Sequence, residues 1–173
     1  FGQADALRAA PSARGLPQPL ALMQIRLRPA AVSDAPSVAS ILIEARAQFM
    51  PYAPSPHTSE EMRSWVSELL VPSGAVTVAE NTGTVVGFMA CSSAEPYRWI
   101  DQMSVKPALV GQGVGSQLLA HALLTLPLPI RLYTFQANLG ARRFYERHGF
   151  LAVKFTDGQA NEERCPDVLY ERQ

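Results

Sequence analysis

Three glycines between a strand-like run and a helix-like run are the residues with the clearest chemical meaning in this sequence. Gly111, Gly113 and Gly115 follow the apolar run 99–105 and precede the helical pattern 116–126. The first turn of a helix has four backbone N–H groups without internal partners, and the helix dipole is positive there. Because glycine has no Cβ, it admits an anion closely and adopts positive φ readily. The arrangement predicts a site for a phosphate or diphosphate, with an ordinary tight turn as the alternative.

Composition limits the class of protein. A length of 173 residues suggests one domain, and 47% hydrophobic with 17% charged residues provides enough apolar material for a core. Fifteen basic and 15 acidic residues give a formal net charge of zero, whereas nucleic-acid binders usually carry a basic excess. No apolar run approaches the ~18–20 residues of a membrane span. We therefore expect neither nucleic acid nor a membrane as a partner.

The two cysteines indicate the redox compartment of the protein, and the first residues of the chain indicate where its folded domain begins. Cys91 and Cys165 lie far apart, and nothing resembles a disulfide framework or a paired-cysteine zinc site. We expect no metal and a cytoplasmic, reducing setting. Residues 1–22 are rich in Ala, Pro and Arg and lack the apolar segment of a signal peptide. We expect them to be an extension outside the fold, with a single domain over 23–173.

Hydrophobic periodicity predicts an alternation of strands and helices. The predicted strands are 24–29, 75–80, 84–92, 99–105, 130–135, 150–156 and one around 168–170, and the predicted helices are 34–49, 59–70, 116–126 and 139–148. The predicted order is therefore β-α-α-β-β-β-α-β-α-β-β. This is an α/β (α+β) arrangement in one domain.

Two of these stretches resemble a known family. The run 99–126, taken with Asn138-Leu139-Gly140-Ala141-Arg142-Arg143-Phe144-Tyr145-Glu146-Arg147-His148-Gly149-Phe150, resembles the GNAT superfamily of acyl-CoA-dependent N-acyltransferases. The family's turn pattern is Gln/Arg-x-x-Gly-x-Gly/Ala; Gly113 and Gly115 match it, while Val110 stands at the Gln/Arg position. The resemblance implies a mixed, twisted, mostly antiparallel sheet of six to seven strands flanked by four helices. It also implies that the sheet is splayed between its fourth and fifth strands.

The resemblance further implies where acetyl-CoA binds. The pantetheine arm would lie in the splay like an added strand, and the diphosphate would lie on the glycine turn. The implied cofactor-binding residues are Met103, Ser104, Val105, Gly111, Gln112, Gly113, Val114, Gly115, Ser116, Asn138, Arg142 and Tyr145. For Asn138 the alternative is an ordinary helix N-cap. For Arg142 it is a solvated helix face.

Acyl transfer from a thioester to an amine requires a neutral amine, a polarised carbonyl and a proton for the departing thiolate. A primary amine with a pKa of about 10 is mostly protonated at neutral pH, so a base must remove its proton. Backbone N–H groups of the splayed strand, such as that of Val105, can polarise the carbonyl. The resemblance implies that Tyr145 protonates the sulfur; the alternative is a tyrosine packed in the core. Neither cysteine is required.

Four residues are candidates for the base, and Asp101 is the one we select. It lies two residues before Met103 in the predicted fourth strand, so both side chains point to the same face. The alternative is an acidic strand residue that simply faces solvent. Glu80, Glu95 and His57 remain candidates as well.

The acceptor site is predicted from two loops. His57 follows a proline loop at a position that often lines the acceptor groove in this fold. Glu162, or its neighbour Glu163, lies in the polar stretch 157–164 and can hold an amine. Ordinary exposed loops are the alternative for both. The acceptor itself is not readable from the sequence.

Together these features predict an enzyme that transfers an acetyl group from acetyl-CoA to a primary amine by direct attack in a ternary complex. A non-catalytic acyl-CoA-binding or sensing module is the alternative. A dinucleotide-binding oxidoreductase is disfavoured because the glycines are spaced Gly-x-Gly-x-Gly rather than Gly-x-Gly-x-x-Gly. Acetyl-CoA and the amine are the expected partners, and a homodimer through edge strands is compatible with the fold.

Overall fold

The computed structural model describes residues 23–173. Residues 1–22 lie outside the described part of the chain, so their assignment as an extension stays a prediction. The strands are β1 (Ile25–Pro29), β2 (Val76–Asn81), β3 (Thr84–Ala94), β4 (Tyr97–Val105), β5 (Ile130–Phe135), β6 (Leu151–Phe155) and β7 (Asp167–Arg172). The helices are α1 (Ala35–Phe49), α2 (Ser59–Trp65), α3 (Val114–Thr125) and α4 (Leu139–Arg147), with short helical turns η1 (Val32–Asp34), η2 (Val66–Leu70) and η3 (Pro107–Leu109). The predicted order of strands and helices is confirmed.

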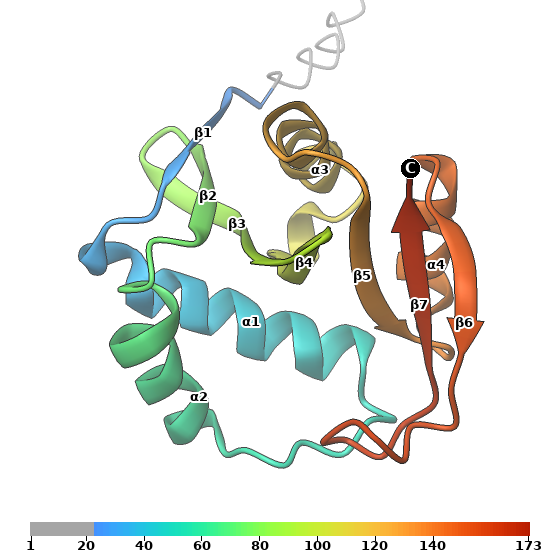
Figure 1. The fold of residues 1–173 in the computed structure, drawn as a ribbon. Coiled ribbons are helices and arrows are strands. Elements are labelled where there is room, and N and C mark those ends of the chain that lie inside the picture. The colour runs from blue at the N-terminus through green and yellow to red at the C-terminus, as the bar shows by residue number, and fades with distance from the viewer. Residues whose placement is uncertain (1–22) are drawn as a thin grey trace, which may run out of the picture.

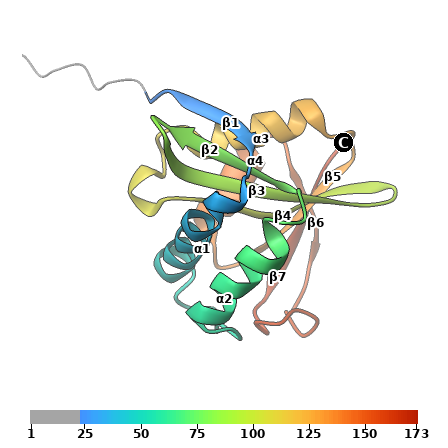
Figure 2. The same cartoon turned by 90° about the vertical axis from the view of Figure 1, so that its left-hand side faces the viewer.

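The seven strands form one sheet in the order β1-β2-β3-β4-β5-β7-β6. Every neighbouring pair is antiparallel except β4 and β5, which are parallel. Helices α1 and α2 cover one face of the sheet, and α3 and α4 lie on the other (Figures 1 and 2). This is the mixed, mostly antiparallel sheet with four helices that the sequence predicts.

Strands β4 and β5 separate almost as soon as they meet. Only Arg98 pairs with Ile130 and Trp99 with Arg131; beyond these two positions the strands are not paired. In Figure 1, β5 continues beside β7 while β4 stays with β3. The facing edges of β4 and β5 therefore keep backbone groups that the sheet does not satisfy. The predicted splay is present.

Close packing of α3 on the sheet fixes the glycine turn relative to this gap. Gly87 in β3 lies under the start of α3; a Cβ there would come within 3.1 Å of both Ser104 O and Val114 Cγ1. Val114 and Leu118 are fully buried in the core on this side. Because the first residue of α3 is anchored in the core, the turn that precedes it has a defined position.

Helix α2 does not continue as a regular helix. The N–H of Val71 donates to Val66 O at 3.0 Å, five residues back, which makes η2 a π-helical turn. The sequence pattern places Leu69 in the apolar stripe of this helix, but Leu69 is 64% exposed. The wider turn shifts the side chains around the helix axis, and the predicted apolar stripe is therefore wrong at Leu69. Val66 remains fully buried.

The loop between β6 and β7 contains a glycine that a larger residue cannot replace. Gly158 has φ +82°, and a Cβ there would lie 2.2 Å from the carbonyl carbon of Cys165. Gly83 in the β2–β3 turn has nearly the same φ, +81°, but open space around it. We expect Gly83→Ala to lower the free energy of unfolding by about 1 kcal/mol, and Gly158→Ala to lower it by ~2 kcal/mol more.

Thermal and urea unfolding of the two variants measure this difference. Since both carry the same backbone strain, the excess reports only the close approach to Cys165. Equal losses in both variants would contradict the packing of this loop.

Candidate active site

The glycine turn presents unpaired backbone N–H groups to open space. Gly111 and Gly113 have φ of +84° and +88°, and a Cβ built at either meets no atom within 4 Å. Gly113 is the N-cap of α3. Among residues 23–173, no protein acceptor binds the N–H groups of Gly111, Gly113, Val114, Gly115 or Ser116. These five groups are free to bind an anion.

Gln112 differs from the other residues of the turn. Its backbone N–H donates to Leu109 O at 3.2 Å, and its side-chain Nε2 donates to Ala108 O at 3.1 Å. Its main role is therefore to close the turn. Val110, at the position where the family pattern has Gln or Arg, is 53% exposed.

The free edge of β4 directs alternate backbone groups into the gap. Lys106 N–H donates to Val86 O at 2.9 Å, which makes the neighbouring pair Gly87–Val105 a non-hydrogen-bonded pair of the antiparallel ladder. The N–H and C=O of Val105 consequently point away from β3, toward β5. By the same alternation those of Met103 do so too. Both residues offer the gap the hydrogen bonds of a missing strand.

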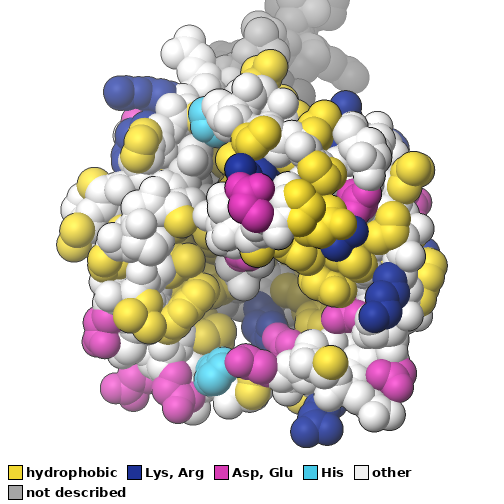
Figure 3. Space-filling view, viewed as in Figure 1, with side chains coloured by type: hydrophobic (Ala, Val, Ile, Leu, Met, Phe, Trp, Pro, Cys, Tyr) yellow, Lys and Arg dark blue, Asp and Glu magenta, His cyan; other side chains and the backbone are white. Residues whose placement is uncertain are grey.

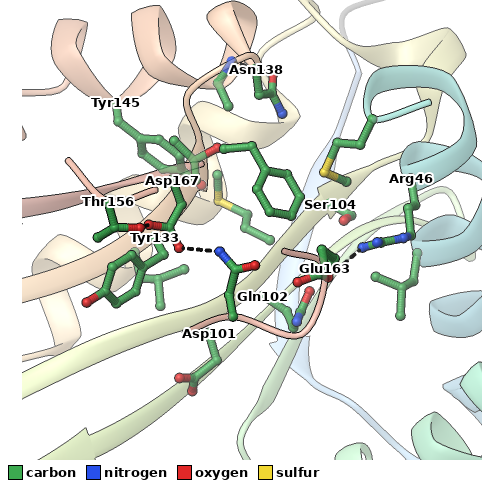
Figure 4. A pocket seen from close by; sticks show the side chains of 18 of the residues that line it. Arg46, Asp101, Gln102, Ser104, Tyr133, Asn138, Tyr145, Thr156, Glu163 and Asp167 are labelled. Atoms are coloured by element: carbon green, nitrogen blue, oxygen red, sulfur yellow. Dashed lines mark hydrogen bonds and ion pairs between the residues drawn. The ribbon is translucent and has the colours of Figure 1, made fainter. Parts of the chain in front are cut away.

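A cavity of about 540 Å³ opens where β4 and β5 part. Its walls come from β4, β5, α1, α4 and the β6–β7 loop (Figure 4). The lining includes Arg46, Asp101, Gln102, Met103, Ser104, Tyr133, Thr134, Phe135, Asn138, Tyr145, Lys154, Thr156, Asn161, Glu163 and Asp167. We call this the inner cavity. It brings together both predicted catalytic residues, Tyr145 and Asp101.

Tyr145 is packed in the core yet reaches the cavity. The residue is 8% exposed, and its ring contacts Phe144 and Phe150 edge-on. No protein group described in the structure bonds its hydroxyl. Every fully buried side-chain polar atom of the described residues has a partner, so this unbonded hydroxyl is not fully buried and is open to the cavity. Burial raises the pKa of Tyr145 well above its ordinary value. The hydroxyl therefore stays protonated and can donate its proton.

Asp101 lies in a β-bulge at the wall of the cavity. Ala90 pairs with Gln102 and Cys91 with Ile100, which leaves Asp101 as the extra residue of β4. Although the residue is open to solvent, the concave wall removes part of its hydration and raises the pKa of the carboxyl; a hydrogen bond with Ser92 opposes this. A raised pKa makes the carboxylate a better proton acceptor.

Two other candidate bases lie outside both cavities. Glu80 binds Arg28 Nε at 2.8 Å, and Glu95, in the β3–β4 turn, binds Arg98 at 2.8 Å. Neither lines the inner cavity. Of the four candidates, only Asp101 shares the inner cavity with Tyr145.

The two predicted acceptor-binding residues meet in space. His57 Nε2 lies 3.2 Å from Glu162 Oε2, across 105 positions of sequence. Both line a second cavity of about 440 Å³, the outer cavity, formed with Leu42, Arg46, Glu61, Met62, Trp65, Gln102 and Glu163. Figure 3 shows a hollow below the centre of the molecule, with acidic side chains and a histidine along its lower rim.

Asn138 and Arg142 are already engaged by the protein. Asn138 Oδ1 accepts the N–H of Ala141 at 3.1 Å and so caps α4, while the residue also lines the inner cavity. Arg142 Nε donates to the hydroxyl of Tyr170 at 3.2 Å, and its guanidinium lies 5.5 Å from the centre of the Phe155 ring. These contacts hold the Arg142 guanidinium against β6 and β7.

Sequence reasoning missed two groups that shape the site. Arg46 Nη1 binds Glu163 at 3.1 Å and joins α1 to the β6–β7 loop (Figure 4). Asp167 is 8% exposed and accepts hydrogen bonds from the Thr156 hydroxyl and from Asn161 Nδ2, the latter at 2.9 Å. Periodicity marks the strand in which Asp167 begins, but not the loop that folds back on it.

No helix in residues 23–173 is long and apolar enough to cross a membrane. Within the same range, no group of three His, Cys, Asp or Glu residues is placed to hold a metal ion.

A mixed sheet parted between its fourth and fifth strands, with a glycine turn at the start of the following helix, is a GNAT-type fold. The model of the acetyltransferase (GNAT) family matches residues 41–150. The chain therefore belongs to the GNAT family of acetyltransferases, and the resemblance seen in its motifs is confirmed. No curated protein sequence matches the chain.

Solved structures share the fold at low sequence identity. PaiA N-acetyltransferase from Thermoplasma acidophilum, in complex with coenzyme A, superposes with a TM-score of 0.71 at 20% identity, over 87% of this chain and 99% of that chain. Apo YjaB from Escherichia coli gives 0.70 at 22% identity, over 86% of this chain and 97% of that chain. At these identities the likeness concerns the fold.

Proposed function

We propose that the protein transfers an acetyl group from acetyl-CoA to a primary amine by direct attack in a ternary complex. One observation carries the proposal: the open N–H groups of the glycine turn and the unpaired edge of β4 lead to a single cavity that contains Tyr145 and Asp101. A protein that only binds acyl-CoA would have no need of an acid and a base in that cavity.

The residues present fit the nucleotide end and the arm of the cosubstrate. The N–H groups of Gly111 and Gly113 through Ser116 would hold the diphosphate, since no side chain fills the space in front of the two glycines. The backbone groups of Met103 and Val105 would bind the pantetheine amides in the manner of a neighbouring strand. Asn138 would contribute its amide nitrogen, because its oxygen caps α4. Arg142 would contribute only an outer contact.

In the proposed reaction acetyl-CoA supplies the thioester that the amine attacks. Asp101 takes the proton of the incoming ammonium group, directly or through water. The N–H of Val105, which points into the gap, stabilises the negative charge that develops on the carbonyl oxygen. As the C–S bond breaks, Tyr145 donates its proton to the departing sulfur, and it regains a proton, directly or through water, from the nitrogen that becomes the amide. Tyr145 and Asp101 line one cavity, and the N–H of Val105 faces the gap beside it.

Direct transfer agrees with the state of Cys91, the cysteine beside Asp101. Burial raises the pKa of the Cys91 thiol to about 11, and the neighbouring Asp101 adds to the shift. Because the thiolate is the nucleophile, such a cysteine is poorly suited to carry an acyl group. His57 and Glu162 would flank the acceptor at the exposed rim of the outer cavity.

We expect Gly113→Val to abolish binding of acetyl-CoA, by at least about a hundredfold in Kd. The branched side chain would stand in the open space in front of the turn, where the diphosphate is proposed to lie. Isothermal titration calorimetry measures the loss.

Gly83→Val is the matched control because Gly83 has a similar positive φ and equally open surroundings but lines neither cavity. It should bind acetyl-CoA as the parent does. Unchanged affinity in Gly113→Val would rule out the diphosphate position.

We expect Tyr145→Phe to lower kcat by about a hundredfold while Kd for CoA changes by less than about threefold. The substitution keeps the buried ring and removes only the proton donor. Thiol release with a panel of amines measures kcat, and Tyr133→Phe, on the wall of the same cavity, serves as control.

Equal turnover in Tyr145→Phe and the parent would remove the acid role of Tyr145. If the parent binds acetyl-CoA but releases no thiol with any amine, the non-catalytic binding module is the better account.

A further inference from the structure

The outer cavity has an apolar wall. Leu42 of α1 and Met62 and Trp65 of α2 line it on one side. Trp65 is 37% exposed, a large apolar surface for a side chain that periodicity alone would place in the core. The residue directly precedes the π-helical turn η2, and such turns often occur at functional sites. The wall is suited to a hydrocarbon or aromatic group.

The less exposed charged groups of the outer cavity are already paired, and the exposed ones lie in contact with each other. Arg46 binds Glu163 at 3.1 Å, with both side chains largely buried at 17% and 20% exposure. His57 lies 3.2 Å from Glu162. A second cation on the ligand would have to replace Arg46 or His57 as the partner of a carboxylate. Replacing the partly buried Arg46 costs more than replacing the exposed His57.

The remaining carboxylate is also committed. Glu61 Oε2 accepts the backbone N–H of Thr58 at 2.7 Å, while the Thr58 side chain accepts the backbone N–H of Glu61. The two bonds form the capping box at the start of α2. The surface left over in the outer cavity is therefore the apolar wall together with Gln102.

The two cavities form one continuous site. Leu42, Arg46, Gln102 and Glu163 line both of them. Gln102 directly follows Asp101 in β4, so a ligand body in the outer cavity lies close to the proposed base. A volume of about 440 Å³ is in the range of sites for small molecules.

We propose, building on the proposed acetyl transfer, that the acceptor is a small primary amine with one uncharged apolar body. The body lies against Trp65, Met62 and Leu42, and the amine extends past Gln102 to Asp101. Diamines and polyamines are poor acceptors because the second ammonium group meets an apolar wall and carboxylates that already have partners.

Hexylamine and hexamethylenediamine test this substrate class, since they differ only in the terminal ammonium group. We expect kcat/KM for hexylamine to exceed that for the diamine by at least about tenfold in the parent. Trp65→Ala should lower kcat/KM for hexylamine about tenfold, through KM, with little change for the diamine. Met62→Glu should shift the preference toward the diamine by placing an unpaired carboxylate on the apolar wall.

Leu69→Ala is the matched control, because Leu69 follows in η2, is exposed and does not line the cavity. It should leave both amines unaffected. A parent that prefers the diamine, or a Trp65→Ala effect no larger than that of Leu69→Ala, would overturn the proposal.

Calorimetry with hexylamine in the presence of CoA separates this proposal from the proposed reaction. If neither amine releases thiol, acetyl transfer to these amines fails, but hexylamine binding that weakens about tenfold in Trp65→Ala still supports the apolar site. Absence of hexylamine binding to the parent overturns it.

Discussion

The separation of β4 from β5 after two paired positions is the constraint on which the site depends. Backbone N–H and C=O groups that lose a partner in a sheet must find another, because leaving them unpaired away from water is costly. The surrounding structure prevents the strands from closing. β5 is fully paired with β7 on its other side, and α3 is seated against β3 through the close contact at Gly87. The packing of the surrounding elements therefore keeps the gap open, and its backbone N–H and C=O groups can bind a ligand or water.

Burial raises the pKa of both proposed catalytic groups, with a different consequence for each. It keeps the hydroxyl of Tyr145 protonated, which suits a proton donor, and it raises the pKa of Asp101, which makes the carboxylate a stronger acceptor. In the proposed reaction, one partly dry cavity would thus hold both the acid and the base. The loop between β6 and β7 contributes to that environment, since Glu163 binds Arg46 across the cavity and Asn161 binds Asp167 below it.

The features that sequence predicts well are local ones. Strand and helix order follows from periodicity, and the glycine turn is recognisable because its function needs a strand, positive φ and a helix start within a short stretch. Asn138 shows the limit of such reasoning: capping and ligand contact both favour asparagine there, and the structure shows the cap while leaving the amide nitrogen facing the cavity.

Features that depend on distant contacts or on one inserted residue could not be predicted from the sequence pattern. The bulge that places Asp101 at the cavity wall depends on the pairing of β4 with β3, so periodicity could not separate Asp101 from Glu80 or Glu95. The pairing of His57 with Glu162 joins two loops 105 positions apart. The exposure of Leu69 follows from a π-helical turn that the apolar pattern does not encode.

The central claim is that main-chain N–H groups of the glycine turn and of β4 hold the cosubstrate. Titration of the isotope-labelled protein with CoA, followed by amide NMR, tests it most directly. The account predicts the largest shifts at Gly111, at residues 113–116, and at Met103 and Val105, with a smaller shift at Gln112, whose N–H is already bonded. Shifts confined to other surfaces, with these amides unchanged at saturation, would contradict it.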